Sequence, residues 1–171
     1  MIRPLVPADA DELAAVLSAN RHVFEPIMAD RPPGYYTAAY QHARLERHAN
    51  PSPDNETWLF AILDGDAIAG TLNLGDVIRS AVQRANIGYW VDVSRYGRGF
   101  ATAAVANAIE FAFGEAGLHR LVAATLPDNV ASQRVLEKNG FTQFGVAHRL
   151  VMIRGEWRDH VLYERIADAS G

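Results

Sequence analysis

Hydrophobic positions in the first third of the chain repeat with the period of helices that cover a core. Leu13 and Leu17 stand one helical turn apart, and the acidic residues just before them favour the start of a helix. Residues 34–49 show a second helical pattern, and the apolar run 2–6 predicts a short strand. Residues 20–33 mix apolar, acidic and proline positions, so they predict an irregular segment between the two helices.

The middle of the chain changes to the patterns of strands. Residues 57–63 are apolar and rich in β-forming residues, and the turn at 64–67 predicts that 68–77 return antiparallel to them. Residues 85–93 predict a third strand of this meander. The stretch Asn50-Pro51-Ser52-Pro53-Asp54 predicts a loop ahead of the strands.

The final third alternates helix and strand before it ends in a hairpin. A wide apolar stripe predicts a helix from about Gly99 to Ala116 that lies against a sheet. Residues 121–126 follow this helix as a buried strand, which predicts pairing parallel to the strand at 85–93. The remaining elements are predicted to be a short helix from Asn129 to Gly140 and two strands, 144–153 and 156–166, around Arg154-Gly155.

This order of elements predicts one α+β domain over residues 1–171, with helices on both faces of a mixed sheet. The sequence has no cysteine, which excludes disulfides, thiol catalysis and thiolate metal ligands. Its net charge of −4 argues against broad electrostatic binding of nucleic acid. No long apolar run predicts a membrane span or a secretory leader, so we expect a cytoplasmic protein with no membrane partner.

A turn with two glycines joins the strand at 85–93 to the alanine-rich helix. Gly97 and Gly99 let the backbone curl and approach a ligand closely. The first N–H groups of the following helix lack partners within it, and the helix dipole favours an anion there. Arg95 and Arg98 add positive charge, so the stretch suggests a cradle for a pyrophosphate.

Two other interpretations of this turn stay open. Glycines between a strand and a helix are often ordinary turn residues. A dinucleotide-binding fingerprint would need a third glycine where the chain has Thr102, and an acidic residue at the end of the next strand. Residues 121–126 carry no such acid, which disfavours a dinucleotide site.

Two motifs resemble those of the GNAT N-acetyltransferases. Tyr96-Gly97-Arg98-Gly99-Phe100-Ala101 is similar to the cofactor loop of that superfamily, with tyrosine at the first position. The stretch from Asn129 to Phe141 is similar to its second motif, in the expected order and spacing. The tyrosine of the loop and the preceding Ile87-Gly88-Tyr89-Trp90 resemble the branch of ribosomal-protein alanine and serine N-terminal acetyltransferases.

The resemblance implies the GNAT fold, with a mostly antiparallel sheet of roughly six to seven strands and about four helices. It also implies acetyl-CoA as cosubstrate, with pantetheine inserted beside the strand that precedes the loop. A backbone N–H within Trp90–Val93 would then hold the thioester carbonyl as an oxyanion donor. The implied cofactor-binding residues are Trp90, Val91, Val93, Arg95, Tyr96, Gly97, Arg98, Gly99, Phe100, Ala101, Thr102, Asn129 and Ser132.

Asn129 and Ser132 are spaced to share one helix face with Leu136. From residue preference alone, Asn129 is equally well explained as a helix N-cap and Ser132 as a small satisfied hydroxyl. The resemblance assigns the Asn129 amide to pantetheine. Many GNAT enzymes carry a tyrosine acid at the position of Leu136, and Ser132 is the candidate substitute that would protonate the leaving thiolate. Tyr163 is a second candidate acid, although a tyrosine in a strand is more often a core residue.

The sequence does not identify the general base. Residues 85–88 of the strand before the loop carry no carboxylate. An α-amine has a pKa near 8, against about 10.4 for lysine, so it needs less help to lose its proton. The irregular segment 20–40 and the final hairpin are expected to form the acceptor wall, where Glu25 and Asp30 would attract a cationic amine. The remaining candidate bases are Glu56, Glu25, Asp30, His148 and Glu156.

These features predict an acetyl-CoA-dependent N-acetyltransferase in which a neutral amine attacks the thioester directly. The preferred acceptor is a protein N-terminal α-amine, and a ribosomal protein is one candidate. Two alternatives stay open: a small amine such as an amino acid, polyamine or antibiotic, and a non-catalytic acyl-CoA sensor. The six histidines lack the spacing of metal ligands, so no metal is expected, and the protein is expected to be a monomer or homodimer.

Overall fold

The computed structural model describes residues 1–49 and 56–167, which build one seven-stranded sheet in the order β1-β2-β3-β4-β5-β7-β6. Neighbouring strands pair antiparallel except for β4 and β5, which are parallel. The strands are β1 (Ile2–Pro4), β2 (Trp58–Asp64), β3 (Ala67–Ile78), β4 (Arg84–Val91), β5 (Arg120–Thr125), β6 (Thr142–Ile153) and β7 (Glu156–Ile166).

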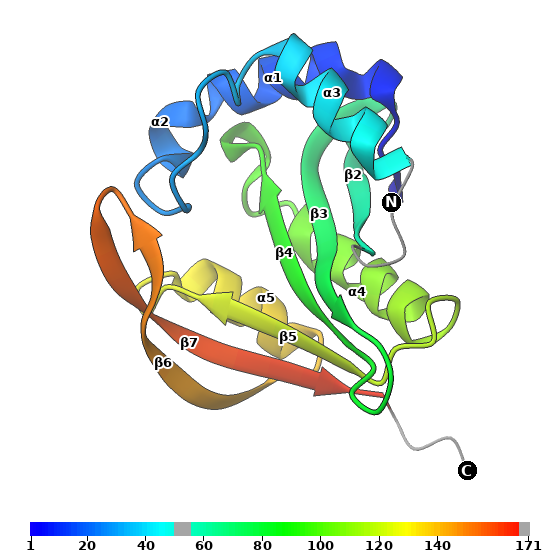
Figure 1. Cartoon of the computed structure of the whole chain (residues 1–171), viewed down its shortest axis with the longest axis vertical. Coiled ribbons are helices and arrows are strands. Elements are labelled where there is room, and N and C mark those ends of the chain that lie inside the picture. Colours follow the sequence, from blue (N-terminus) through cyan, green and yellow to red (C-terminus); the bar gives the residue numbers. More distant parts are fainter. Residues whose placement is uncertain (50–55, 168–171) are drawn as a thin grey trace.

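Helices cover the sheet on both faces, as the sequence predicts (Figure 1). On one face, Leu13, Leu17 and Leu45 pack against Leu59 and Ile68 of the sheet. On the other face, a larger core joins the apolar sides of α4 and α5 to the remaining strands. The helices are α1 (Ala10–Ala19), α2 (Arg21–Phe24), α3 (Ala38–Ala49), α4 (Phe100–Phe113) and α5 (Val130–Lys138).

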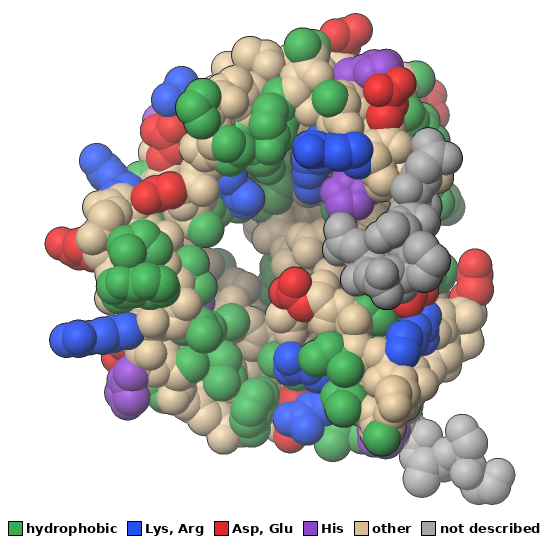
Figure 2. Space-filling model, viewed as in Figure 1, with side chains coloured by type: hydrophobic (Ala, Val, Ile, Leu, Met, Phe, Trp, Pro, Cys, Tyr) green, Lys and Arg blue, Asp and Glu red, His purple; other side chains and the backbone are tan. Residues whose placement is uncertain are grey.

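The parallel strands β4 and β5 pair over only a short distance. Their register joins Arg84–Asn86 to Arg120–Val122, and beyond these residues the two strands diverge. Figure 1 shows the strands separating toward the carboxyl end of β4, with α2 above the gap and the β6–β7 hairpin beside it. The space-filling view shows an opening that passes through the molecule at this place (Figure 2). The fold therefore leaves a passage where the two parts of the sheet separate.

Local hydrogen bonds shift several predicted boundaries. The first strand ends at Pro4 rather than Val6, because residues 7–9 form a 3₁₀ turn. The second helix begins at Ala38 rather than Gly34, because Gly34 has a φ of +79° and the Thr37 hydroxyl accepts the N–H of Tyr40. The last two strands form the predicted hairpin, but β6 begins two residues early, at Thr142. The predicted loop at 50–54 lies outside the described residues.

Two further boundaries matter for the site. The strand predicted to reach Val93 ends at Val91, because the Asp92 side chain accepts the Ser94 N–H and starts a 3₁₀ turn at residues 93–95. The helix predicted to reach Ala116 ends at Phe113, followed by Gly114 with non-helical ψ. Within the described ranges, no helix is long and apolar enough to cross a membrane.

Candidate active site

The turn between β4 and α4 presents backbone N–H groups without side-chain caps. Gly97 and Gly99 adopt φ values of +74° and +84°, which residues with a side chain rarely adopt. Gly99 occupies the N-cap position of α4, and among the described residues no side chain bonds to the leading N–H groups of this helix. The leading N–H groups of α4, at Phe100, Ala101 and Thr102, are therefore available to an anion in the field of the helix dipole. A Cβ at Gly97 or Gly99 would meet nothing within 4 Å, so the surroundings of both are open.

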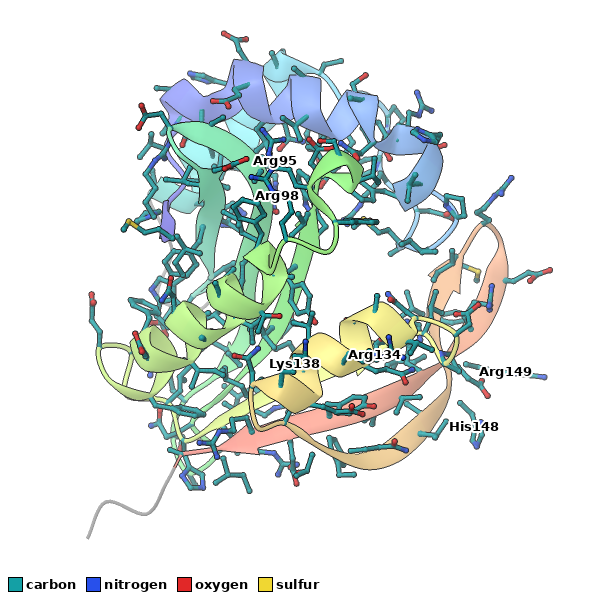
Figure 3. All side chains as sticks on the ribbon, turned by 180° about the vertical axis from the view of Figure 1, so that it is seen from behind. Arg95, Arg98, Arg134, Lys138, His148 and Arg149 are labelled. Atoms are coloured by element: carbon teal, nitrogen blue, oxygen red, sulfur yellow. The ribbon has the colours of Figure 1, made fainter. Side chains whose placement is uncertain are left out.

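Arg95 and Arg98 both contact carboxylates near this turn. Arg95 forms ion pairs with Asp92 and with Asp64, the latter at 3.2 Å, and Arg98 reaches the same Asp64 oxygen at 3.1 Å. Figure 3 shows the two arginines close together near the start of α4. The Arg98 side chain is 55% exposed, and its guanidinium lies over the Phe100 ring, 5.0 Å from the ring centroid. Arg98 can therefore turn toward an anion more readily than the more buried Arg95.

The edge of β4 that faces the opening carries the backbone groups of Tyr89 and Val91. The Asp92 N–H donates to the Ala69 carbonyl of β3 at 2.7 Å. Hydrogen bonds alternate along an antiparallel ladder, so Trp90 also turns its N–H toward β3, whereas Tyr89 and Val91 turn theirs toward the side where β5 diverges. Of the run Trp90–Val93, Val91 is the residue whose N–H faces the opening.

The segment that follows α1 contacts both Val93 and Trp90. The Val93 N–H donates to Asn20 Oδ1 at 2.9 Å, and the Trp90 ring packs on Phe24 with centroids 5.0 Å apart. Asn20 is 1% exposed, and its Nδ2 also donates to Val16 O at 2.9 Å and to Asp92 Oδ1 at 3.2 Å. Asn20 therefore fastens α1 and α2 to the end of β4.

We expect Asn20→Ala to lower the free energy of unfolding by about 2 to 3 kcal/mol, because it leaves the Val93 N–H without its buried acceptor. Urea denaturation measures this loss. Asn86→Ala is the matched control, because Asn86 makes an exposed hydrogen bond to Asp76 and its loss should cost under about 1 kcal/mol. Equal unfolding midpoints for the two variants would contradict the bridging role of Asn20.

Asn129 and Ser132 lie at the start of α5, on the other side of the opening. Asn129 is the N-cap of α5, and its Oδ1 accepts the Ser132 N–H at 3.1 Å. The capping interpretation of Asn129 is thus confirmed. Capping uses only the amide oxygen, so the Nδ2 group of Asn129 can still donate to a ligand.

Tyr89 is a further candidate site residue, which the sequence analysis missed. Its hydroxyl lies 2.9 Å from Ser132 Oγ and 3.2 Å from the Ser132 carbonyl oxygen. Burial raises the pKa of Tyr89 to about 12, against the smaller lowering by the hydrogen bond with Ser132, so the phenol stays protonated at neutral pH. The sequence did contain a signal, since the Tyr89 hydroxyl is the polar side-chain group in the otherwise apolar end of the strand, Ile87–Val91.

The other candidate acid, Tyr163, lies apart from this pair. It belongs to the large core with 2% of its surface exposed. Its hydroxyl donates to Glu137 Oε1 at 3.4 Å, more than one helical turn along α5 from Ser132. Burial raises the pKa of Tyr163, and the nearby Glu137 raises it further. The structure therefore brings Ser132 and Tyr89 together but keeps Tyr163 away from them.

The candidate bases are mostly engaged elsewhere. Glu56 pairs with Arg79 at 2.7 Å, and Asp159 contacts His148 at 2.8 Å on the hairpin. Figure 3 shows His148 projecting from the hairpin, far from Arg95 and Arg98. Within the described part of the chain, no group of three or more His, Cys, Asp or Glu residues is placed to hold a metal ion.

The two segments predicted to form the acceptor wall lie beside the opening, and their carboxylates have partners that the sequence did not indicate. Glu25 pairs with Arg21 at 2.6 Å, and Asp30 Oδ1 accepts the backbone N–H of Arg154 at 2.9 Å. Both carboxylates are thus engaged with partners in the chain. The segment 20–40 and the β6–β7 hairpin do meet, as the sequence predicts.

Comparison with known proteins supports the family resemblance. Residues 1–142 match the family model described as "Acetyltransferase (GNAT) domain". The probable N-acetyltransferase YjcK of Bacillus subtilis is 39% identical over 93% of this chain and 89% of its own length. The [ribosomal protein uS5]-alanine N-acetyltransferase of Escherichia coli is 30% identical over 95% of this chain and 84% of its own.

A solved structure gives the same result for the fold. Mycobacterium smegmatis RimJ, solved in complex with CoA-disulfide, superimposes with a TM-score of 0.91 at 30% identity, covering 97% of this chain and 81% of that one. The match confirms the predicted GNAT fold, with its mostly antiparallel mixed sheet and helices on both faces.

Proposed function

The chain belongs to the GNAT family of N-acetyltransferases, and on that basis we propose that it moves the acetyl group of acetyl-CoA to the N-terminal α-amine of a protein. A ribosomal protein is the preferred class of acceptor, since the relative from Escherichia coli is named for ribosomal protein uS5. The observation that carries the proposal is the opening beside β4, with the uncapped helix on one side and the Tyr89–Ser132 pair on the other.

The residues along the opening fit acetyl-CoA. The N–H groups from Gly97 to Thr102 would hold the pyrophosphate, with Arg98 and Arg95 adding positive charge. The free edge of β4 would pair with pantetheine in the manner of an added strand. Asn129 Nδ2 would donate to pantetheine from the other side. Tyr96 and Phe100 flank the same turn.

The bound thioester supplies an activated acetyl group. In the transfer, the amine nitrogen forms a bond to the carbonyl carbon, the carbon–sulfur bond breaks, the nitrogen loses a proton and the sulfur gains one. The Val91 N–H is the donor in the run Trp90–Val93 that can stabilise negative charge on the carbonyl oxygen. Ser132 would donate its hydroxyl hydrogen toward the sulfur, and Tyr89, whose hydroxyl lies 2.9 Å from Ser132 Oγ, would then be the donor of that pair.

An α-amine acceptor suits a site in which β4 offers no carboxylate as a general base. Residues 85–88 of β4 contain none, and Val91 is followed by Asp92, which is bound to Arg95, Ser94 and Asn20. At pH 7 an α-amine with a pKa near 8 is partly neutral, whereas a lysine with a pKa near 10.4 is almost wholly charged. Water can carry the proton of the α-amine away without a dedicated side-chain base.

A panel of acceptors tests this proposal. Wild-type protein with acetyl-CoA is assayed for thiol release against peptides with free α-amines, the same peptides with blocked α-amines but free lysines, and spermidine or single amino acids. We expect release with the free α-amine peptides, and mass spectrometry should place the acetyl group on the first residue. Release only with small amines would overturn the proposed acceptor class. Acetyl-CoA binding without release across the whole panel would indicate a sensor.

A further inference from the structure

A groove lies between the segment after α2 and the turn of the β6–β7 hairpin. It has a volume of about 570 Å³ and joins these two parts of the chain. The hydrogen bond from the Arg154 N–H to Asp30 Oδ1 holds the hairpin turn against the segment. The lining residues are Arg21, Glu25, residues 28–34, Tyr36, Thr37 and Arg154.

The groove lies at the mouth of the opening. The α2 segment that contributes Arg21 and Glu25 to the groove is attached to the end of β4, because Phe24 packs on Trp90 and Asn20 bonds to Val93. Figure 1 shows the loop after α2 beside the turn of the β6–β7 hairpin, at the edge of the gap between β4 and β5. A peptide whose first residue enters the opening from this side would therefore lay its next residues along the groove.

Positive charge predominates in the lining. The groove has three arginines, Arg21, Arg31 and Arg154, against the two acids Glu25 and Asp30. Glu25 forms an ion pair with Arg21 at 2.6 Å, whereas Asp30 accepts the backbone N–H of Arg154 and keeps its negative charge. Within residues 1–49 and 56–167, the guanidinium groups of Arg31 and Arg154 form no ion pair with a carboxylate.

Aromatic rings hold two of these arginines in place. The Arg31 guanidinium lies 4.8 Å from the centroid of the Tyr35 ring, and Tyr35 is buried. The Arg21 guanidinium lies 4.9 Å from the Tyr36 ring in the same way. A guanidinium stacked on a ring keeps its edge free for the two oxygens of a carboxylate. These cations also stand out in a chain whose net charge is −4.

We propose that this groove selects acceptor peptides with acidic side chains at the second to fourth positions, which bind Arg31 and Arg154. The proposal rests on the proposed function, since it requires a peptide acceptor. The acids of the peptide would supply carboxylate partners to two guanidinium groups that form no ion pair within residues 1–49 and 56–167. A basic peptide would place like charges beside the same groups, so the groove both attracts one class of acceptor and rejects the other.

Matched peptides test the selection. Peptides with the same free N-terminal residue carry glutamate, glutamine or lysine at positions two to four, and kcat/KM is measured for each with the full chain. We expect the glutamate peptide to exceed the glutamine peptide about tenfold at low salt, with the ratio falling as salt screens the charges. The difference should lie mainly in the KM for the peptide, with kcat little changed.

Variants test whether the preference for acidic peptides comes from the groove arginines or from surface charge elsewhere. Arg31→Gln with Arg154→Gln should bring the glutamate-to-glutamine ratio to within about twofold, while Arg47→Gln, an exposed change on α3, should leave it unchanged. Wild-type protein with equal kcat/KM for the glutamate and glutamine peptides would overturn the inference about the groove. An unchanged ratio in the double variant would do the same. Neither result would contradict the proposed function. Thiol release with spermidine but with no peptide would overturn the proposed function, and this inference with it.

Discussion

Thr102→Glu is expected to weaken acetyl-CoA binding about 100-fold while the melting temperature stays equal or rises. Thr102 lies in the first turn of α4, where a carboxylate favours the helix by about 0.3 to 1 kcal/mol. The same carboxylate repels the pyrophosphate: at about 5 Å and an effective dielectric of about 20, one pair of like charges costs about 3 kcal/mol. Titration calorimetry measures the affinity, and calorimetric unfolding measures the stability.

Ala39→Glu is the matched control for this experiment. Ala39 lies exposed in the first turn of α3, so the change adds the same charge at a similar helical position on the opposite face of the sheet. It should leave the affinity for acetyl-CoA within about twofold. Equal affinities for the Thr102 and Ala39 variants would contradict the assignment of the pyrophosphate to the start of α4.

Ser132→Ala is expected to lower kcat about 100-fold with little change in the KM for acetyl-CoA, because it removes the hydroxyl assigned to the leaving sulfur. Tyr89→Phe should lower kcat less, by about tenfold, since it removes only the group that orients Ser132 through the 2.9 Å contact. Steady-state kinetics over a range of pH measures both variants. A poorer thiol leaving group, compared with a better one, should enlarge the effect of Ser132→Ala.

Tyr163→Phe distinguishes the two candidate acids. It removes a hydroxyl that contacts Glu137 rather than Ser132, so kcat should stay within about twofold of wild type. Both tyrosine variants keep the ring and its packing, which makes them comparable. A loss of kcat in the Tyr163 variant with none in the Ser132 variant would reverse the assignment.

Much of the fold could be predicted from local patterns. The glycines at 97 and 99 mark the turn at the carboxyl end of β4, and the alanine-rich stripe after them gives α4 and its buried face. The apolar run at 121–126 lies between two helical patterns and becomes the parallel strand β5. These features depend on residues close together in the sequence, so periodicity and turn chemistry report them directly.

The contacts that shape the site join residues far apart in the sequence. Tyr89 meets Ser132, and Asn20 caps the end of β4 through Val93, across separations that no local pattern records. The charge pattern of the predicted acceptor wall also depends on contacts that the sequence does not record. Glu25 and Asp30 suggested a site for a cation, but Arg21 pairs with Glu25, and the guanidinium groups of Arg31 and Arg154 line the same groove.

The most direct test of the account is a crystal structure of the protein with coenzyme A. The account predicts the pyrophosphate on the N–H groups from Gly97 to Thr102, and pantetheine along the free edge of β4 at Tyr89 and Val91. It places the sulfur within about 3.5 Å of Ser132 Oγ. A pyrophosphate bound away from the start of α4, or a sulfur out of reach of Ser132, would contradict it.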